Sequence, residues 1–507
     1  MKRSFTPTLT LIALLTGCAV GPDYQPPAPQ TPGSWHDSAD NGVASRTRSD
    51  AINPRWWTTF NSPQLNSLIE RAIAGNLSLQ QTVLRIAGAR EQINQARGAF
   101  FPAVNGNLQA TRQQLGLKGE LESHDVYDQL DQVDPELRGA LGPLTQPINL
   151  YQGSFDAQWE LDLWGKVRRQ VEAADAQRQA AIEQRNDALV SLEAEVARAW
   201  LQLRGAQSII ATLSAQIASA QQTLELTQNR QQGGLSPQLD VENARAQLGN
   251  LEAQLPQYQA QERQAMNGLA ILLGKTPGAL DSELRSVQPL PTLPDIVATG
   301  IPATLARRRP DVREAEANLH AATAQIGVSV AQLFPDLTLR GQFGMRNSEV
   351  DWLDDWSSHF YSVGPQLSIP IFQGGRLVSS VKVARAQQGA AVLQYRQTVL
   401  TALGDVENAL VSYRTDQQRE AGLDKTIEAL QTAFNLASDS YRQGMATFID
   451  VLDAQRQLSQ AEQQRAQARV QSSLDLVALY KALGGGWEPY QQVRMPDYSV
   501  FGDAPHG

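Results

Sequence analysis

Several kinds of chemistry are missing from this chain. Its single cysteine, Cys18, has no partner for an internal disulfide. Five histidines are present, but they do not cluster with cysteines or carboxylates at metal-ligand spacing. No nucleophile motif or phosphate-binding loop occurs, so an enzyme or an energy-driven pump is not indicated. A net charge of −9 and the absence of basic runs argue against a nucleic-acid partner. Beyond the N-terminus, no apolar run reaches the ~18 residues of a membrane-spanning helix.

What the chain does contain is an internal repeat at an offset of about 210 residues. The offset carries Gly234 to Gly444 and Asp240 to Asp450. It also relates two apolar seams with alternating three- and four-residue steps, and only Asp416 and Glu420 interrupt the second seam. A period near 3.5 over this length predicts very long helices packed as coiled coils. We therefore predict a duplicated, elongated protein.

We divide the chain at the turn-forming residues between its segments. Glycine and proline clusters separate the helical regions. The predicted parts are a signal peptide (1–17), an extended proline-rich tether (18–62), a first repeat (63–275), a linker or equatorial region (276–309), a second repeat (310–486) and a C-terminal tail (487–507). Each repeat is expected to hold a helix, two strands and a long helical hairpin.

The N-terminus has the features of a lipoprotein signal. Lys2 and Arg3 precede a short apolar run, and the tetrapeptide ending at Cys18 resembles the lipobox of bacterial lipoproteins. In such proteins the cysteine is acylated, so a covalent lipid on Cys18 is the only expected cofactor. Ala19 follows, and not the aspartate typical of inner-membrane retention, which implies the outer membrane. The alternative is an ordinary signal peptide with an incidental cysteine.

Four segments alternate apolar and polar residues with period two. They cover roughly 104–111, 154–163, 336–346 and 361–371. Their length of about ten residues is typical of transmembrane β-strands. Because the smallest membrane barrels have about eight strands, four cannot close one. We therefore predict that three copies share a twelve-stranded barrel, since a dimeric eight-stranded barrel would be filled by side chains. The alternative is a soluble, half-buried sheet.

Long helices flank these strands. They are expected from Gly165 to about Gln231 and from about Gly375 to Gln443, with shorter returning helices at 238–273 and 447–483. Further helices are expected at 63–99 and 310–333. The turns at the two hairpin tips contain Gly233, Gly234, Leu235 and Ser236, and Gly444, Met445, Ala446 and Thr447. The fold class is thus mixed α/β, a barrel continuous with a helical tunnel.

Acidic residues occur at two further places. The segment 115–152 holds seven carboxylates and forms either an extracellular loop of specific function or a merely solvated one: Glu120, Glu122, Asp125, Asp128, Asp131, Asp134 and Glu136. Asp156, Glu160 and Asp162 would face the barrel lumen. Arg340 and Arg346 partly offset their charge, so strong ion selectivity is not expected.

Three features together resemble the outer membrane factor family, specifically TolC-like channels of the NodT-type lipoprotein subgroup. They are the lipobox with its proline-rich start, the segment 300–312 containing Arg-Arg-Pro-Asp, and the segment 441–456. The resemblance covers nearly the whole chain. It implies a homotrimer in the outer membrane of a Gram-negative bacterium, extending into the periplasm. It also implies a function as the exit duct of an inner-membrane pump, joined through a periplasmic adaptor.

The same resemblance places a periplasmic gate at Asp450 and Asp453, which share one helix face and would form two rings of carboxylates in a trimer. Like charges in a narrow aperture raise carboxylate pKa values and attract cations. In the first copy of the repeat, Asp240 corresponds to Asp450, and Asn243 occupies the position that corresponds to Asp453. Tyr441 is expected to hydrogen-bond to a neighbouring hairpin or to pack in the seam. The alternative is that the two aspartates are merely solvated residues on the helix surface. The tips are expected to dock the adaptor, with Gly234 and Gly444 permitting close helix approach there.

The expected cargo is small molecules such as drugs or toxic organics, conducted passively. An outlet for protein secretion or for metal ions would share the architecture, although no methionine cluster or histidine tract favours metal. From another class, a structural coiled-coil lipoprotein would have long helices and no β-strands.

Overall fold

The structure is a computed structural model that describes residues 19–28, 31–36, 43–114, 116–126 and 146–492. These residues fall into two compact units, each built from separate stretches of chain. We call the described residues of 1–24, 90–175 and 320–389 the sheet unit. The described residues of 25–89, 176–319 and 390–492 form the helical unit. Residue 18 and the segment 127–145 lie outside the described residues, and so do the predictions made for Cys18 and for the four carboxylates from Asp128 to Glu136.

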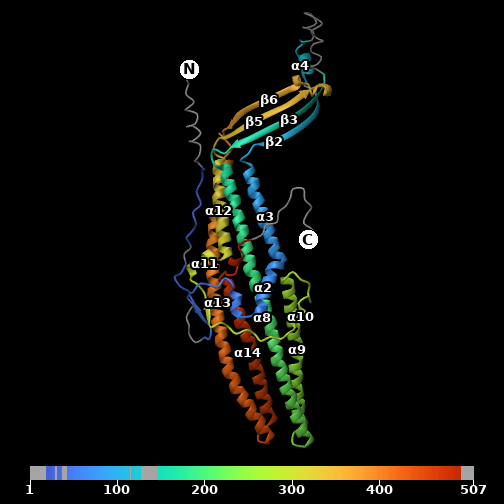
Figure 1. Ribbon diagram of the computed structural model, residues 1–507, viewed down its shortest axis with the longest axis vertical. Helices are drawn as coiled ribbons and strands as arrows, with labels where there is room; N and C mark the ends of the chain where they lie inside the picture. The colour runs from blue at the N-terminus through green and yellow to red at the C-terminus, as the bar shows by residue number, and fades with distance from the viewer. Residues whose placement is uncertain (1–18, 29–30, 37–42, 115, 127–145, 493–507) are drawn as a thin grey trace. The chain divides into compact units, whose positions relative to one another are not determined.

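The sheet unit contains the four predicted strands in one antiparallel sheet. The strands are β2 (Ala103–Gln113), β3 (Ile148–Leu161), β5 (Asp336–Asn347) and β6 (His359–Ser368), in the order β2-β3-β5-β6 (Figure 1). Phe155 pairs with Phe343, which pairs with Tyr361, so these apolar side chains share one face. One residue along, the register brings polar side chains together on the other face. The predicted strands and their two-sided character are confirmed.

Two strand ends differ from the prediction. β3 ends at Leu161, so Asp162 is not a strand residue facing a lumen. Its carboxylate accepts hydrogen bonds from the backbone N–H groups of Val167 and Arg168, both at 3.0 Å, and thereby caps the helix that follows. β6 ends at Ser368, before Pro370, whose nitrogen cannot donate to a ladder.

The long helices match the predicted bounds within one or two residues. α8 (Lys166–Gln232) and α13 (Arg376–Arg442) have 67 residues each, and α9 (Gln238–Leu272) and α14 (Phe448–Ala482) have 35 each. α12 spans Pro310–Ala331. Along α8, Leu189, Val196 and Leu203 recur at seven-residue steps in the first apolar seam, and all three are fully buried. None of the helices in the described residues is both apolar enough and long enough to cross a membrane.

The prediction of a single helix at 63–99 is wrong. It is two helices, α2 (Pro63–Gly75) and α3 (Leu77–Gly98), separated at Asn76. The Asn76 side chain accepts a hydrogen bond from the N–H of Leu79 and donates one to the carbonyl of Leu272. An asparagine that satisfies backbone groups on both sides stabilises the interruption.

Short elements complete the described chain. A two-stranded parallel sheet that was not predicted pairs β1 (Arg46–Arg48) with β4 (Ile296–Ala298). The remaining elements are η1 (Trp56–Phe60), α4 (Leu117–Ser123), α10 (Asp281–Leu284), α11 (Pro302–Arg308), η2 (Val350–Trp352), η3 (Trp356–Ser358) and η4 (Glu488–Tyr490).

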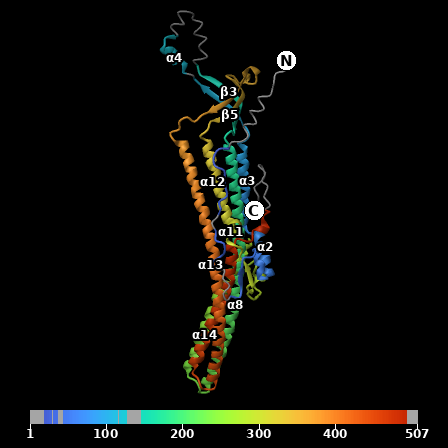
Figure 2. The same cartoon turned by 90° about the vertical axis from the view of Figure 1, so that its left-hand side faces the viewer.

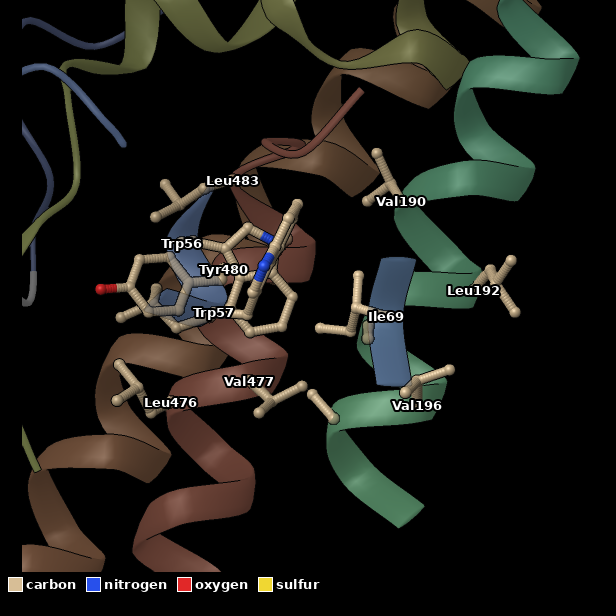
Figure 3. Packing of buried hydrophobic residues seen from close by; sticks show 14 of the residues in the cluster. Trp56, Trp57, Ile69, Val190, Leu192, Val196, Leu476, Val477, Tyr480 and Leu483 are labelled. Carbon is tan, nitrogen blue, oxygen red and sulfur yellow. The ribbon is translucent and has the colours of Figure 1, made fainter. Parts of the chain in front are cut away.

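The main hydrophobic core lies within the helical unit. Figure 3 shows Trp56 and Trp57 of η1 and Ile69 of α2 between side chains of α8 and α14. Trp56 is fully buried and stacks on Tyr480, with ring centroids 5.2 Å apart. Burial of aromatic rings of this size contributes strongly to stability. This core holds α8 and α14 in one body.

Candidate functional site

The tips of the two helical hairpins lie at the same end of the helical unit (Figures 1 and 2). α8 and α13 end in the same way. The N–H of Leu235 donates to the carbonyl of Arg230 at 2.8 Å, and the N–H of Met445 donates to the carbonyl of Ser440 at 2.8 Å. These bonds define a Schellman motif, which places the preceding residue in the left-handed region. That residue is a glycine in both turns.

Gly234 and Gly444 both have a left-handed backbone conformation. Their φ angles are +71° and +77°, and a Cβ atom added to either would meet no atom within 4 Å. Within the chain these glycines therefore supply backbone conformation, and the close helix approach expected where the adaptor docks stays a prediction.

A tyrosine connects the two tips. Tyr441, near the end of α13, is only 4% exposed. Its hydroxyl lies 2.7 Å from the Oγ of Ser236 in the other tip and 3.4 Å from the carboxylate of Asp240. Ser236 also donates to Asp240, at 2.6 Å. We call Tyr441, Ser236, Asp240 and Arg230 the tip clasp. Two of the four predicted gate residues, Tyr441 and Asp240, are thus brought together.

Arg230 is the member that the sequence did not reveal. Its guanidinium lies over the ring of Tyr441, 4.5 Å from the centroid, and donates to the carbonyl of Arg442 at 3.1 Å. A cation over an aromatic face is attracted by the ring quadrupole. One arginine of the first hairpin therefore contacts both the aromatic ring and the backbone of the second. No signal in the sequence could have paired positions so far apart.

A small apolar cluster supports the clasp. Tyr441, Phe448, Val451 and Ala244 are buried together, and the rings of Tyr441 and Phe448 are 5.7 Å apart. Beside them lies a cavity of about 310 Å³, lined by polar residues of α8 and α13 and by the same two rings. The predicted alternatives for Tyr441, a hydrogen bond and packing in the seam, are thus both present in one chain.

The two predicted ring aspartates are exposed and lie outside the clasp. Asp450 accepts hydrogen bonds from the N–H (3.0 Å) and Oγ1 (2.7 Å) of Thr447, forming a capping box at the start of α14. These bonds, first that from the Thr447 side chain, lower the pKa of Asp450. Within one chain the pKa therefore shifts opposite to the rise expected for a ring. Asp453 accepts from Gln457 at 2.7 Å.

The polar face of the sheet carries the remaining predicted charges. Asp156 accepts hydrogen bonds from Asn107 and Ser154. Glu160 pairs with Lys166 at 2.9 Å, and Arg346 donates to Gln152 at 2.9 Å. Glu160 therefore has an oppositely charged partner, whereas Asp156 and Arg346 form hydrogen bonds to uncharged side chains. In the described residues, no group of three or more histidine, cysteine or acidic side chains could hold a metal ion.

Several described proteins are similar to this chain over almost its entire length. Nodulation protein T of Rhizobium leguminosarum bv. trifolii is 33% identical and covers 96% of this chain and 98% of its own. Outer membrane protein OprJ of Pseudomonas aeruginosa is 32% identical, with 96% and 97% covered. The toluene efflux pump outer membrane protein TtgF of Pseudomonas putida is also 32% identical, with 95% and 96% covered.

Solved structures agree with these relatives. The outer-membrane channel OprN superposes with a TM-score of 0.82 at 32% identity, covering 93% of this chain and all of its own. A model of the outer membrane efflux protein family matches residues 68–275 and 301–485, well over half of the sequence. The chain therefore belongs to the outer membrane efflux protein family.

Proposed function

We propose that this chain is the outer-membrane exit duct of a tripartite efflux system and conducts small molecules such as drugs or toxic organics passively. The observation that carries the proposal is a four-stranded sheet with one apolar and one polar face, in a chain similar along its length to the channel OprN. Relatives described as outer membrane proteins of efflux pumps support the cargo class. A duct needs no catalytic residue, and its function is transport.

The proposed assembly is a homotrimer. The sheet ends in β2 on one side and β6 on the other, and an open edge in hydrocarbon would leave backbone groups unpaired. Pairing the β2 of one copy with the β6 of the next would make a closed barrel of twelve strands from three chains. The apolar side chains would then face lipid; Leu108, 92% exposed in the single chain, is an example.

In this proposal the hairpin tips form a periplasmic gate. The tip clasp would hold the two hairpins of each chain together through Tyr441, Ser236 and Asp240. Asp450 and Asp453 are exposed and available to line an aperture at the threefold axis. Carboxylates from three chains converging there would attract cations and repel one another. Opening would require the clasp to break and the hairpins to separate.

The tips are also the proposed contact with a periplasmic adaptor, which would connect the duct to an inner-membrane pump. Leu235 and Met445 support this assignment because large apolar side chains are exposed at both turns, 70% and 71% respectively. Cross-linking intact membranes and purifying the trimer should recover the adaptor. Replacing both residues with serine should abolish that recovery while leaving the trimer intact.

Two alternatives within the transport class, a protein-secretion outlet and a metal-ion outlet, share this architecture. A structural coiled-coil lipoprotein without strands does not, because the sheet is present. Growth of an outlet-deficient host expressing this chain, with toluene, antibiotics, Cu²⁺ or a secreted reporter protein, would separate the three transport cargoes. Resistance limited to Cu²⁺ would contradict the proposed small-molecule cargo.

The gate is tested by conductance. Purified trimer should conduct in planar bilayers, and the double variant Asp450→Ala with Asp453→Ala should conduct more because the carboxylate rings are gone. Glu428→Ala is the matched control, since it removes an exposed carboxylate in α13 away from the tip. Equal conductance of the double variant and the wild type would contradict the gate residues. The absence of any conductance in the wild-type trimer would contradict its function as a duct.

The lipid anchor on Cys18 is a further part of the proposal. Cells labelled with radioactive palmitate should yield a labelled wild-type chain and an unlabelled Cys18→Ser variant. Label retained by the variant would place the acyl group elsewhere.

A further inference from the structure

The C-terminal end of the described chain fits closely against the helical unit. Residues 484–490, which we call the C-terminal clip, begin with three glycines, and all three are buried. A Cβ atom added to Gly485 would lie 2.9 Å from Nη2 of Arg308. One added to Gly486 would overlap Oε2 of Glu193 in α8. The backbone of the clip therefore lies directly on the carboxyl group of Glu193.

Polar contacts hold the clip in this place. The indole nitrogen of Trp487 donates to the carbonyl of Arg308 at 3.1 Å, and the guanidinium of Arg313 lies 4.7 Å from the centroid of the Trp487 ring. Glu488 pairs with Arg308 at 2.8 Å, and its carboxylate also accepts a hydrogen bond from the N–H of Gly486 at 3.0 Å. Glu488 therefore connects the backbone of the clip to α11.

Glu193 has no exposed surface, and neither of its carboxylate oxygens accepts a hydrogen bond of normal geometry. A carboxylate that is buried without a close partner is far less stable charged than neutral. The charged and titratable groups that face it are Arg185 of α8, and Glu488 and Tyr490 of η4. Burial and then the charge of Glu488 raise the pKa of Glu193 well above its ordinary value, whereas Arg185 and the indole of Trp56 lower it.

Ionisation of Glu193 would weaken three contacts of the clip. The new negative charge repels the carboxylate of Glu488. It also attracts the guanidinium of Arg185, which in the structure donates to the carbonyl of Tyr490 at 2.8 Å. Water can solvate the charged carboxylate only if Gly486, which covers Oε2, moves away. All three effects favour the separation of the clip from α8.

We propose that Glu193 is a proton-controlled latch for the C-terminal clip. The neutral carboxyl group lies under Gly486 and keeps the clip closed, and the ionised group releases residues 484–490 from the helical unit. Glu488 and Arg185 set the pH at which the release occurs. The latch is independent of the proposed transport function, because every contact on which it depends lies within the helical unit of one chain.

Hydrogen exchange on the purified full-length protein tests the latch. Because the pKa of Glu193 is raised, the closed clip is fully stabilised below the ordinary value of 4.5 and loses this stabilisation as the pH rises through the raised value. Amides of residues 484–490 should be protected at pH 5 and lose protection toward pH 9, by up to about tenfold per pH unit above that pKa, after correction for chemical exchange.

Glu193→Gln separates the charge from the shape of the side chain. The amide cannot ionise, so the clip of this variant should stay protected over the whole pH range. Glu195→Gln is the matched control, since it changes an exposed carboxylate two residues along α8, and it should open like the wild type. A wild-type clip with equal protection at pH 5 and pH 9, or a Glu193→Gln clip that opens over the wild-type range, would overturn the latch.

Two further variants cover the case in which Glu193→Gln fails to fold. Glu488→Gln removes the repelling charge and should move the midpoint of opening to lower pH. Arg185→Gln removes the attracting charge and should move the midpoint to higher pH. A merely structural role of either side chain would change the protection at every pH without moving the midpoint. Midpoints that stay at the wild-type pH in both variants would contradict the control of the clip by Glu193.

Discussion

The hydroxyl of Tyr441 lies 2.7 Å from the Oγ of Ser236, although 205 positions separate the two residues in the chain. This hydrogen bond connects the tip of one helical hairpin to the tip of the other. Ser236 donates its hydroxyl proton to Asp240 at 2.6 Å, so Tyr441 is the donor of the 2.7 Å bond, and its hydroxyl lies 3.4 Å from Asp240. The ring of Tyr441 contacts Phe448 and Arg230. Removal of the hydroxyl alone would leave the packing in place, so the hydrogen bond can be tested separately.

We expect Tyr441→Phe to raise the open probability of the channel. A hydrogen bond of this kind contributes about 0.5–1.5 kcal/mol, which corresponds to a shift of roughly 2- to 10-fold in the closed–open equilibrium. Single-channel recordings measure the shift. Ser236→Ala should act similarly, and the two changes combined should be less than additive because they remove the same bond. Fully additive effects, or an equal effect of the distant Tyr395→Phe, would contradict the clasp.

The turn glycines lead to a pair of opposite expectations. Gly444→Ala places a side chain at φ +77°, which costs about 1–2 kcal/mol. Gly422→Ala, within α13 and with open space around the added Cβ, should stabilise its helix by up to about 1 kcal/mol. Hydrogen exchange measures both: protection should fall at the tip in the first variant and rise along α13 in the second. If Gly444→Ala left exchange at the tip unchanged, the conformational role of the glycine would be wrong.

Local signals in the sequence predicted the long helices well and the tip contacts poorly. α8 and α13 could be bounded closely because glycine stops each helix and the apolar seam is continuous between. The break at Asn76 was missed because the reason for it, a hydrogen bond to Leu272, comes from a residue almost 200 positions away. The pairing of β1 with β4 and the contact of Arg230 with Tyr441 are equally non-local. Periodicity carries information on which face is buried, but not on which distant residue covers it.

The core around Trp56 offers a stability test. Trp56 is fully buried and stacks on Tyr480, so Trp56→Ala should destabilise the helical unit by roughly 3–5 kcal/mol through the cavity it leaves. The expected result is a clear drop in the thermal midpoint of the helical circular dichroism signal. Trp352→Ala, at a position 56% exposed, is the control and should change the midpoint little. Similar midpoints for the two variants would show that this core does not limit stability.

Asp416, one of the two acidic residues that interrupt the second apolar seam, predicts that the stability of the protein depends on pH. Asp475 of α14 is buried, and its burial, together with a side-chain hydrogen bond to Asp416 of α13, raises its pKa to about 7. A carboxyl group with a raised native pKa binds its proton more tightly in the folded state. Its stabilising contribution is therefore complete below the ordinary value of 3.8 and is lost as the pH rises through about 7.

Asp475→Asn keeps the shape of the protonated carboxyl group and removes the titration. The wild type should lose stability between about pH 4 and pH 7, with the unfolding equilibrium changing by up to about tenfold per pH unit, while the variant should not. At pH 8 the variant should therefore melt at the higher temperature. Asp424→Asn, an exposed aspartate in α13 paired with Arg465, is the matched control. Parallel pH profiles for the wild type and Asp475→Asn would mean that this carboxyl pair does not share a proton, and that the polar break in the seam has another role.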